Sequence, residues 1–113
     1  MDKVEKLSRV AEKILDRYLK IYQKSGGGID TKLIVDRTGR HLQLLRFGWL
    51  NEYEFAHYPA IDFDIRGDKL WILENRTDFD LASDLRQMGI RDEDVVLGFI
   101  PEEERVFTEY AVK

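Results

Sequence analysis

The feature that most constrains the fold is a change of hydrophobic period at the triple glycine Gly26–Gly28. Before it, from Val4 to Tyr22, apolar side chains recur every three or four residues and fill a single arc of a helical wheel. Asp2, with Glu5 three residues after it, is a suitable cap for such a helix. The glycines end the pattern because glycine has a low helix propensity. The sequence therefore predicts an N-terminal amphipathic helix of about five turns.

After the glycines, apolar residues alternate with polar ones, as they do in strands. Pro59 cannot donate a hydrogen bond to a neighbouring strand, so it indicates an edge position or a bulge in the third segment, which continues to Ile65. The pattern predicts an antiparallel meander of about four strands. The expected strands cover residues 29–35, 41–49, 53–58 with its continuation, and 70–73, with turns at 36–39, 51–52 and 66–68.

A second helical pattern follows the meander and carries apolar residues from Leu81 to Met88. Thr77 or Asp78 can cap this helix, and Gly89 can close it. The chain then shows an acidic turn, an apolar run and a last short strand, at residues 92–94, 95–99 and 106–112. The predicted fold class is α+β: an N-terminal amphipathic helix plus an antiparallel meander of about four strands, with a second helix and short C-terminal strand segments.

Composition narrows the class of protein. The chain of 113 residues contains no cysteine, which excludes disulfides and thiolate metal sites. Hydrophobic residues make up 43% of it, enough for one core. No secretory signal is recognisable, and no apolar stretch approaches the roughly 20 residues that cross a bilayer. We therefore expect a single domain over residues 1–113, located in the cytoplasm and not in a membrane.

The residues that suggest chemistry do not form a recognisable catalytic or metal motif. The spacing of Asp62, Asp64 and Arg66 resembles the start of a calcium loop, but a cation stands where an oxygen ligand is needed. His41 and His57 are the two histidines, and neither belongs to a helical metal-binding pair. The sequence therefore predicts no catalytic residue, no cofactor and no metal, and a binding protein rather than an enzyme.

Basic residues are concentrated in the first helix. Residues 1–24 carry a net charge of +3 and residues 25–113 carry −7, which gives the whole chain its charge of −4. A basic stripe can contact phosphates or an acidic partner; the alternative is a solvated face whose bases pair with acids four residues away. The acidic remainder favours indirect or weak contact with DNA. The stripe consists of Lys6, Arg9, Lys13, Arg17, Lys20 and Lys24.

Aromatic and acidic residues suggest a second kind of surface. The two tryptophans, Trp49 and Trp71, lie on predicted strands and are expected in the core. The aromatic residues of the third strand are candidates for a protein interface, and the acidic turn is a candidate for contact with a basic partner, with solvated turns as the alternative. These candidate partner-binding residues are Tyr53, Phe55, Tyr58, Asp92, Glu93 and Asp94.

Four segments, in this order, are similar to the XisI-type fdxN element excision controlling factor family. They read DRTGRHLQLLRFGW from Asp36, GDKLWILENRTD from Gly67, LASDLRQMGIRDEDVVLGF from Leu81 and RVFTEYAV from Arg105. The resemblance covers nearly the whole chain. The chain departs from the family at Asp62, where the family often has histidine before Asp–Ile, and at Thr77–Asp78, where the family has Thr–Glu.

The resemblance implies a small α+β protein of cyanobacterial type. Such a protein acts beside a XisH-type partner to control excision of a DNA element by a separate recombinase. The family supplies no catalytic residues. Two alternatives stay open: an antitoxin-like inhibitor of a nuclease-like partner, and a DNA-binding module that uses the basic stripe. An antiparallel sheet also has exposed edges, so self-association into a homo-oligomer is a further expectation.

Overall fold

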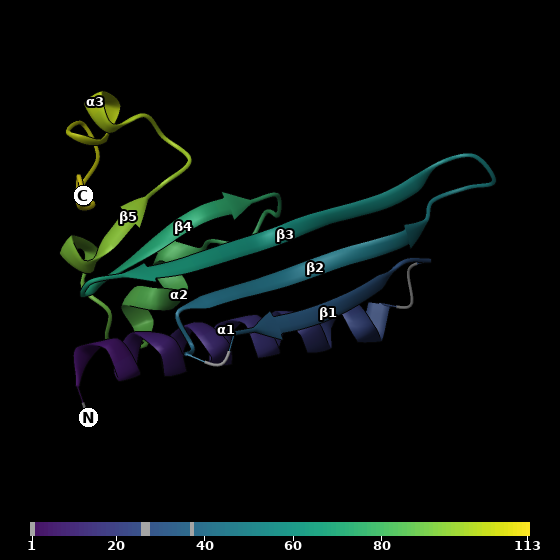
Figure 1. Cartoon of the computed structure of the whole chain (residues 1–113), viewed down its shortest axis with the longest axis horizontal. Helices are drawn as coiled ribbons and strands as arrows, with labels where there is room; N and C mark the ends of the chain where they lie inside the picture. Colours follow the sequence, from purple (N-terminus) through teal and green to yellow (C-terminus); the bar gives the residue numbers. More distant parts are fainter. Residues whose placement is uncertain (1, 26–27, 37) are drawn as a thin grey trace.

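The computed structural model describes residues 2–25, 28–36 and 38–113, in which helices pack against one sheet (Figure 1). The predicted helix stop at Gly26 and Gly27, and Arg37 of the first predicted turn, lie outside the described residues. In chain order the elements are α1 (Lys3–Ser25), β1 (Asp30–Val35), β2 (His41–Trp49), β3 (Phe55–Arg66), β4 (Lys69–Asn75), α2 (Leu81–Gln87), the short 3₁₀ helix η1 (Asp92–Asp94), β5 (Val95–Leu97) and α3 (Glu102–Arg105).

Helix α1 forms over the predicted range. Asp2 Oδ1 accepts a hydrogen bond from the backbone N–H of Glu5 at 2.8 Å, so the predicted cap is confirmed. At the other end, the Ser25 hydroxyl donates to the carbonyl oxygen of Tyr22 at 2.8 Å and satisfies one acceptor of the last turn. Within the described ranges, no helix is both long and apolar enough to cross a membrane. The buried face of α1 consists of Leu7, Val10, Ala11, Ile14, Leu15 and Tyr18.

The sheet has the strand order β1-β2-β3-β4-β5. The first four strands are antiparallel neighbours, which confirms the predicted meander and the α+β class. Strand β5 pairs with β4 in parallel, because α2 carries the chain back between them. This short parallel strand adds a C-terminal edge that hydrophobic alternation alone does not reveal.

A bulge interrupts the pairing of β2 with β3 beside Pro59. Pro59 pairs with Leu45 and Ile61 pairs with Leu44, which leaves Ala60 as the extra residue. The carbonyl oxygen of Ala60 accepts a hydrogen bond from the backbone N–H of Arg76 at 2.8 Å. The predicted bulge is therefore confirmed, and the third strand continues through it to Arg66.

The two faces of the sheet have different surroundings. Helices α1 and α2 lie on the same side of the sheet (Figure 1), where Leu42, Leu44 and Phe63 are fully buried. Burying each such side chain contributes about 1.5–3 kcal/mol. We call the opposite side the open face. By strand register it includes Lys32, Ile34, His41, Gln43, Leu45, Phe47, Phe55, Asp62, Asp64 and Trp71.

The C-terminal segment differs from the prediction. Residues 106–112 do not form a strand: they run through turns, and Ala111 makes a single bridge to Val96. The reason is Arg105, a 9% exposed residue whose guanidinium donates to backbone carbonyl groups and curls the segment around itself. Those carbonyl oxygens belong to Leu97, Ile100 and Val112.

Helix α2 begins later than predicted. Its cap is Asp80, whose side chain accepts a hydrogen bond from the backbone N–H of Ser83 at 3.0 Å, and not Thr77 or Asp78. Thr77 is engaged elsewhere, because its backbone N–H and its hydroxyl both donate to Asn75 Oδ1, at 3.0 and 2.5 Å. The chain therefore makes a side-chain turn at Asn75 before the helix starts.

Candidate protein-docking surface on the hairpin arm

Strands β2 and β3 project beyond the rest of the sheet as a hairpin, which we call the arm (residues 46–58; Figure 1). Neither β1 nor β4 pairs with the hairpin over most of this length. Asn51 organises the turn at the tip: its Oδ1 accepts hydrogen bonds from the backbone N–H groups of Tyr53 and Glu54, at 2.8 and 2.9 Å. The tip therefore has a defined shape even though it stands away from the core.

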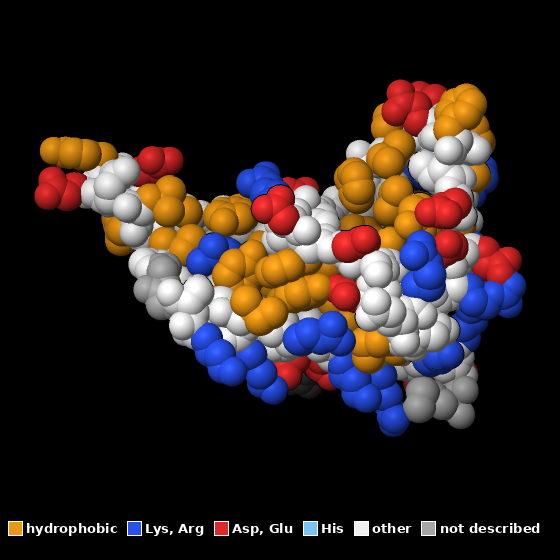
Figure 2. Space-filling model, turned by 180° about the vertical axis from the view of Figure 1, so that it is seen from behind, with side chains coloured by type: hydrophobic (Ala, Val, Ile, Leu, Met, Phe, Trp, Pro, Cys, Tyr) orange, Lys and Arg blue, Asp and Glu red, His pale blue; other side chains and the backbone are white. Residues whose placement is uncertain are grey.

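Large apolar side chains are exposed along the arm. The tip of the projection carries hydrophobic atoms next to acidic ones (Figure 2). Trp49 was expected in the core; it is exposed instead, because it lies on the arm and on the side of the sheet opposite α1 and α2. Its ring packs edge-to-face on Phe55 with centroids 5.2 Å apart. Exposed patches of this kind mark interaction sites on soluble proteins. The exposed fractions are 61% for Trp49, 55% for Leu50, 91% for Tyr53 and 50% for Phe55.

The three aromatic residues predicted to bind a partner occupy different parts of the arm. Tyr53 was expected on the third strand, but it lies in the tip turn, just before β3 begins at Phe55. Phe55 begins β3 and faces the open side of the sheet. Tyr58 faces the helix side, since it pairs with Arg46, and the Arg76 guanidinium lies 5.4 Å from its ring centroid. The arm brings the three residues onto one hairpin but not onto one face.

A groove of about 440 Å³ lies on the helix side of the arm, and we call it the arm groove. Arg46 is its cation: the guanidinium stacks 4.2 Å above the Tyr22 ring, and its Nε donates to Thr31 Oγ1 at 3.2 Å. Burial raises the pKa of the Tyr22 hydroxyl, and the charge of Arg46 opposes that rise. Sequence reasoning missed the groove because its walls come from distant segments. They are Tyr22, Ser25, Gly28, Ile29, Arg46, Trp49, Leu50 and Tyr58.

The predicted acidic contact lies at the other end of the molecule. Asp94 pairs at 2.8 Å with Lys3, which is at the start of α1. The arm groove is lined by Tyr22, which is near the end of α1. These α1 positions are about 28 Å apart at 1.5 Å per residue. Each of the three acids has a basic partner within the chain: Asp92 pairs with Arg86, Glu93 with Arg91 and Asp94 with Lys3. Two separate regions, not one, therefore contain the predicted partner-binding residues.

The basic stripe of α1 is exposed but partly used within the chain. Lys6 Nζ donates to the carbonyl oxygen of Gly89 at 3.1 Å, and Arg17 lies 3.7 Å from Asp84 of α2. Lys20 pairs with Asp16 at 3.0 Å, as the solvated-face alternative predicts. The bases line the border of the molecule where α1 runs (Figure 2). Within the described part of the chain, no ion pair is found for Arg9, Lys13 and Lys24.

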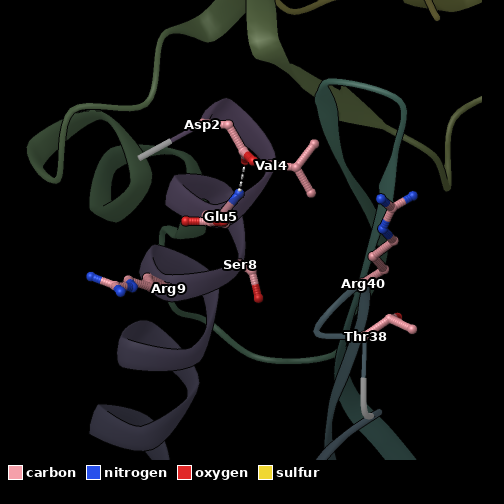
Figure 3. Close-up of a pocket in the computed structure, with 7 residues that line it drawn as sticks. All are labelled: Asp2, Val4, Glu5, Ser8, Arg9, Thr38 and Arg40. Atoms are coloured by element: carbon pink, nitrogen blue, oxygen red, sulfur yellow. Dashed lines mark hydrogen bonds between the residues drawn. The ribbon is translucent and has the colours of Figure 1, made fainter.

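A second groove, of about 450 Å³, separates the start of α1 from the turn before β2 (Figure 3). Among the described residues that line it, the two cations do not converge: Arg9 points away from the strand side, where Arg40 and Thr38 lie (Figure 3). Asp2 on its rim is already the cap of α1. The described part of this groove therefore does not show the convergent polar groups that characterise ligand sites.

The open face carries a polar cluster that follows from strand register. His41 lies between two carboxylates, with Nε2 2.9 Å from Asp62 Oδ1 and Nδ1 3.0 Å from Asp64 Oδ1. Burial raises the pKa of Asp62. Burial acts in the same direction on Asp64, but hydrogen bonds from Arg66 and His41 outweigh it and lower that pKa. The described residues contain no group of three or more His, Cys, Asp or Glu side chains placed to hold a metal.

Comparison with known proteins identifies the relatives of this fold. The chain superimposes on the crystal structure of a XisI-like protein from Anabaena variabilis with a TM-score of 0.88 and 31% identity, covering 97% of this chain and 99% of that one. It also superimposes on the fdxN element excision controlling factor XisI from the same organism, with a TM-score of 0.87, 23% identity and coverage of 99% and 100%. A search of the curated proteins found no match. Because the model of the XisI protein family matches residues 1–112, the chain belongs to the XisI family.

Proposed function

We propose that this chain controls the excision of a DNA element by binding a protein partner, without catalysing a reaction itself. The observation that carries the proposal is the arm, where four large apolar residues are at least half exposed. The name of the related fdxN element excision controlling factor supports the role in excision. A controlling factor acts on another component, and an exposed, shaped aromatic hairpin is suited to that task.

The partner is a XisH-type protein, and the contact is centred on the open side of the arm. Phe55 and Trp49 form its aromatic centre. Tyr53 lies beside it in the tip turn, whereas Tyr58 is on the same hairpin but faces the helix side. Aromatic side chains of this kind are the residues that most often dominate binding energy. The acidic cluster Asp92–Asp94 is left out of this contact, because its carboxylates pair with bases of this chain.

Co-expression with a XisH-type protein tests the proposal. The two proteins should elute from gel filtration as one complex, and Phe55→Ala should weaken that complex at least about tenfold, as truncation of an aromatic hot spot does. Phe107→Ala is the matched control, since Phe107 is 87% exposed but lies in the C-terminal segment. Two independent, folded peaks for the wild-type proteins would contradict the proposal.

The same experiment separates the alternatives. If the partner is toxic when expressed alone and harmless with this chain, the antitoxin-like function is supported in place of excision control. Direct DNA binding by the stripe predicts affinity that falls steeply with salt and is lost when Lys13, Arg17 and Lys20 are replaced by glutamate. We place this function second, because Arg17 and Lys20 already contact acids of the chain.

A further inference from the structure

The tip of the arm has an unusual combination of groups. Tyr53 is 91% exposed, and its neighbours Glu52 and Glu54 are also exposed. The turn is fixed by Asn51, so binding through Tyr53 requires little ordering of the backbone. The tip therefore presents an exposed aromatic side chain, on a hydrogen-bonded turn, between two negative charges.

The arm groove offers the complementary groups. Its walls include the rings of Tyr22 and Tyr58, and Arg46 supplies a positive charge. In the described residues the Arg46 guanidinium makes one hydrogen bond, through Nε to Thr31, although a guanidinium has five N–H donors. The groove volume of about 440 Å³ falls in the range of about 300–1,000 Å³ that is typical of ligand pockets.

We propose that the tip of one copy docks into the arm groove of a second copy, and that the chain forms a twofold dimer in this way. The acidic and aromatic tip matches the basic and aromatic groove in charge and in chemistry. The tip and one wall of the groove lie on the same hairpin, because Leu50 belongs to the tip turn and also lines the groove. Two arms related by a twofold axis and running antiparallel bring each tip to the other groove, so the contact is made twice.

The exposed area is sufficient for such a dimer. Aromatic side chains bury about 150–250 Å² each when they are covered completely. With the exposed fractions of Trp49, Leu50 and Tyr53, and with the side chains that line the groove, each copy provides on the order of 500 Å². Two arms then bury about 1,000 Å², which is the lower limit for a specific interface. The dimer is independent of the proposed excision partner, because Phe55 on the open face lies outside it, although both contacts would use Trp49.

The test measures the mass of the purified protein alone, by sedimentation and light scattering, from about 1 to about 300 μM, where interfaces of this size dissociate. We expect a dimer for the wild type, at least about tenfold weaker association for Tyr53→Ala, and no change for Phe107→Ala. Tyr53 is almost fully exposed, so its truncation leaves the fold intact. A wild type that stays monomeric throughout, or a control as weak as Tyr53→Ala, would overturn the proposal.

Charge exchange identifies the contact itself. Arg46→Glu alone places a glutamate opposite Glu52 and Glu54, and the double variant E52K/E54K alone places lysines opposite Arg46. Each should be monomeric because like charges then meet. An equal mixture of the two variants should form a mixed dimer, since one contact is native and the other has both charges reversed. Failure of the mixture to associate would also overturn the proposal.

Discussion

Replacing Arg105 by methionine is expected to release the C-terminal segment from the sheet. The guanidinium donates to the carbonyl oxygen of Ile100 at 2.8 Å, of Val112 at 3.0 Å and of Leu97 at 3.3 Å. It also lies 4.9 Å from the ring centroid of Trp71. Methionine has a similar length and keeps the apolar packing, but it cannot donate a hydrogen bond. The variant therefore isolates the contribution of the charged donor.

The expected loss of stability is about 3 kcal/mol. A hydrogen bond from a charged donor contributes about 1.5–3 kcal/mol and a cation–π contact about 0.5–2 kcal/mol. The full sum does not appear as lost stability, because the released carbonyl groups regain water when the segment opens. At roughly 4 °C for each kcal/mol in a domain of this size, the melting temperature should fall by about 12 °C.

Thermal unfolding measures the loss, and amide hydrogen exchange locates it. In the variant, residues 98–113 should lose protection while β2 and β3 keep theirs, because the segment opens as a local unit. Arg66→Met is the matched control: Arg66 also lies over Trp71, at 4.4 Å, but it is exposed and pairs with Asp64. Its loss should cost less than about 1 kcal/mol. Equal losses in the two variants, or unchanged protection in Arg105→Met, would refute the reasoning.

Two further predictions concern single sites in the fold. Gly48→Ala should destabilise the arm by about 1–3 kcal/mol, because Gly48 has φ +143° and a Cβ there would lie 3.1 Å from the Cβ of Ile29. Urea unfolding measures this loss. The control is Gly67→Ala, which should cost only about 1 kcal/mol because the space around Gly67 is open. Burial and the hydrogen bond to Asp84 raise the pKa of Tyr18 from 10.0 to about 12. The Tyr18 hydroxyl of the unfolded state therefore ionises first. The stabilisation that this hydroxyl gives to the folded state is complete below pH 10 and is lost as the pH rises to about 12. Tyr18→Phe should lower the free energy of unfolding by about 1 kcal/mol at pH 7 and should not show this loss of stability above pH 10. A wild type and a phenylalanine variant with parallel stability curves above pH 10 would contradict the second prediction.

The elements with local signals are the ones that the sequence predicts well. Helix α1 follows from its apolar spacing and from Asp2 as cap, and the first four strands follow from alternation and from turns. Pro59 predicts its bulge for a local reason, the missing N–H group. The start of α2 was predicted too early because a threonine can serve a side-chain turn as well as a helix cap, and Thr77 serves the turn at Asn75.

Other features depend on chain segments that are distant in the sequence. Alternation gives the two faces of a strand but not which face a helix covers, so Trp49 was expected in the core although it is exposed. A charged residue such as Arg105 is expected at the surface, and only the path of the C-terminal segment surrounds it with carbonyl groups. The arm groove needs Tyr22 from α1 beside Arg46 from β2, and no local pattern predicts that pairing.

The arm differs from the rest of the molecule in what its side chains do for folding. At the β5 end, Asp92 and Asp94 neutralise bases and hold segments together, so replacing them would change stability and binding at once. At the tip, Asn51 organises the turn, whereas the Tyr53 side chain is left almost completely in water and adds little burial energy. Truncation of Tyr53 should therefore change the free energy of unfolding by less than about 0.5 kcal/mol. A loss of association in that variant is then a loss of contact and not of fold, which makes the arm the place where binding can be separated from stability.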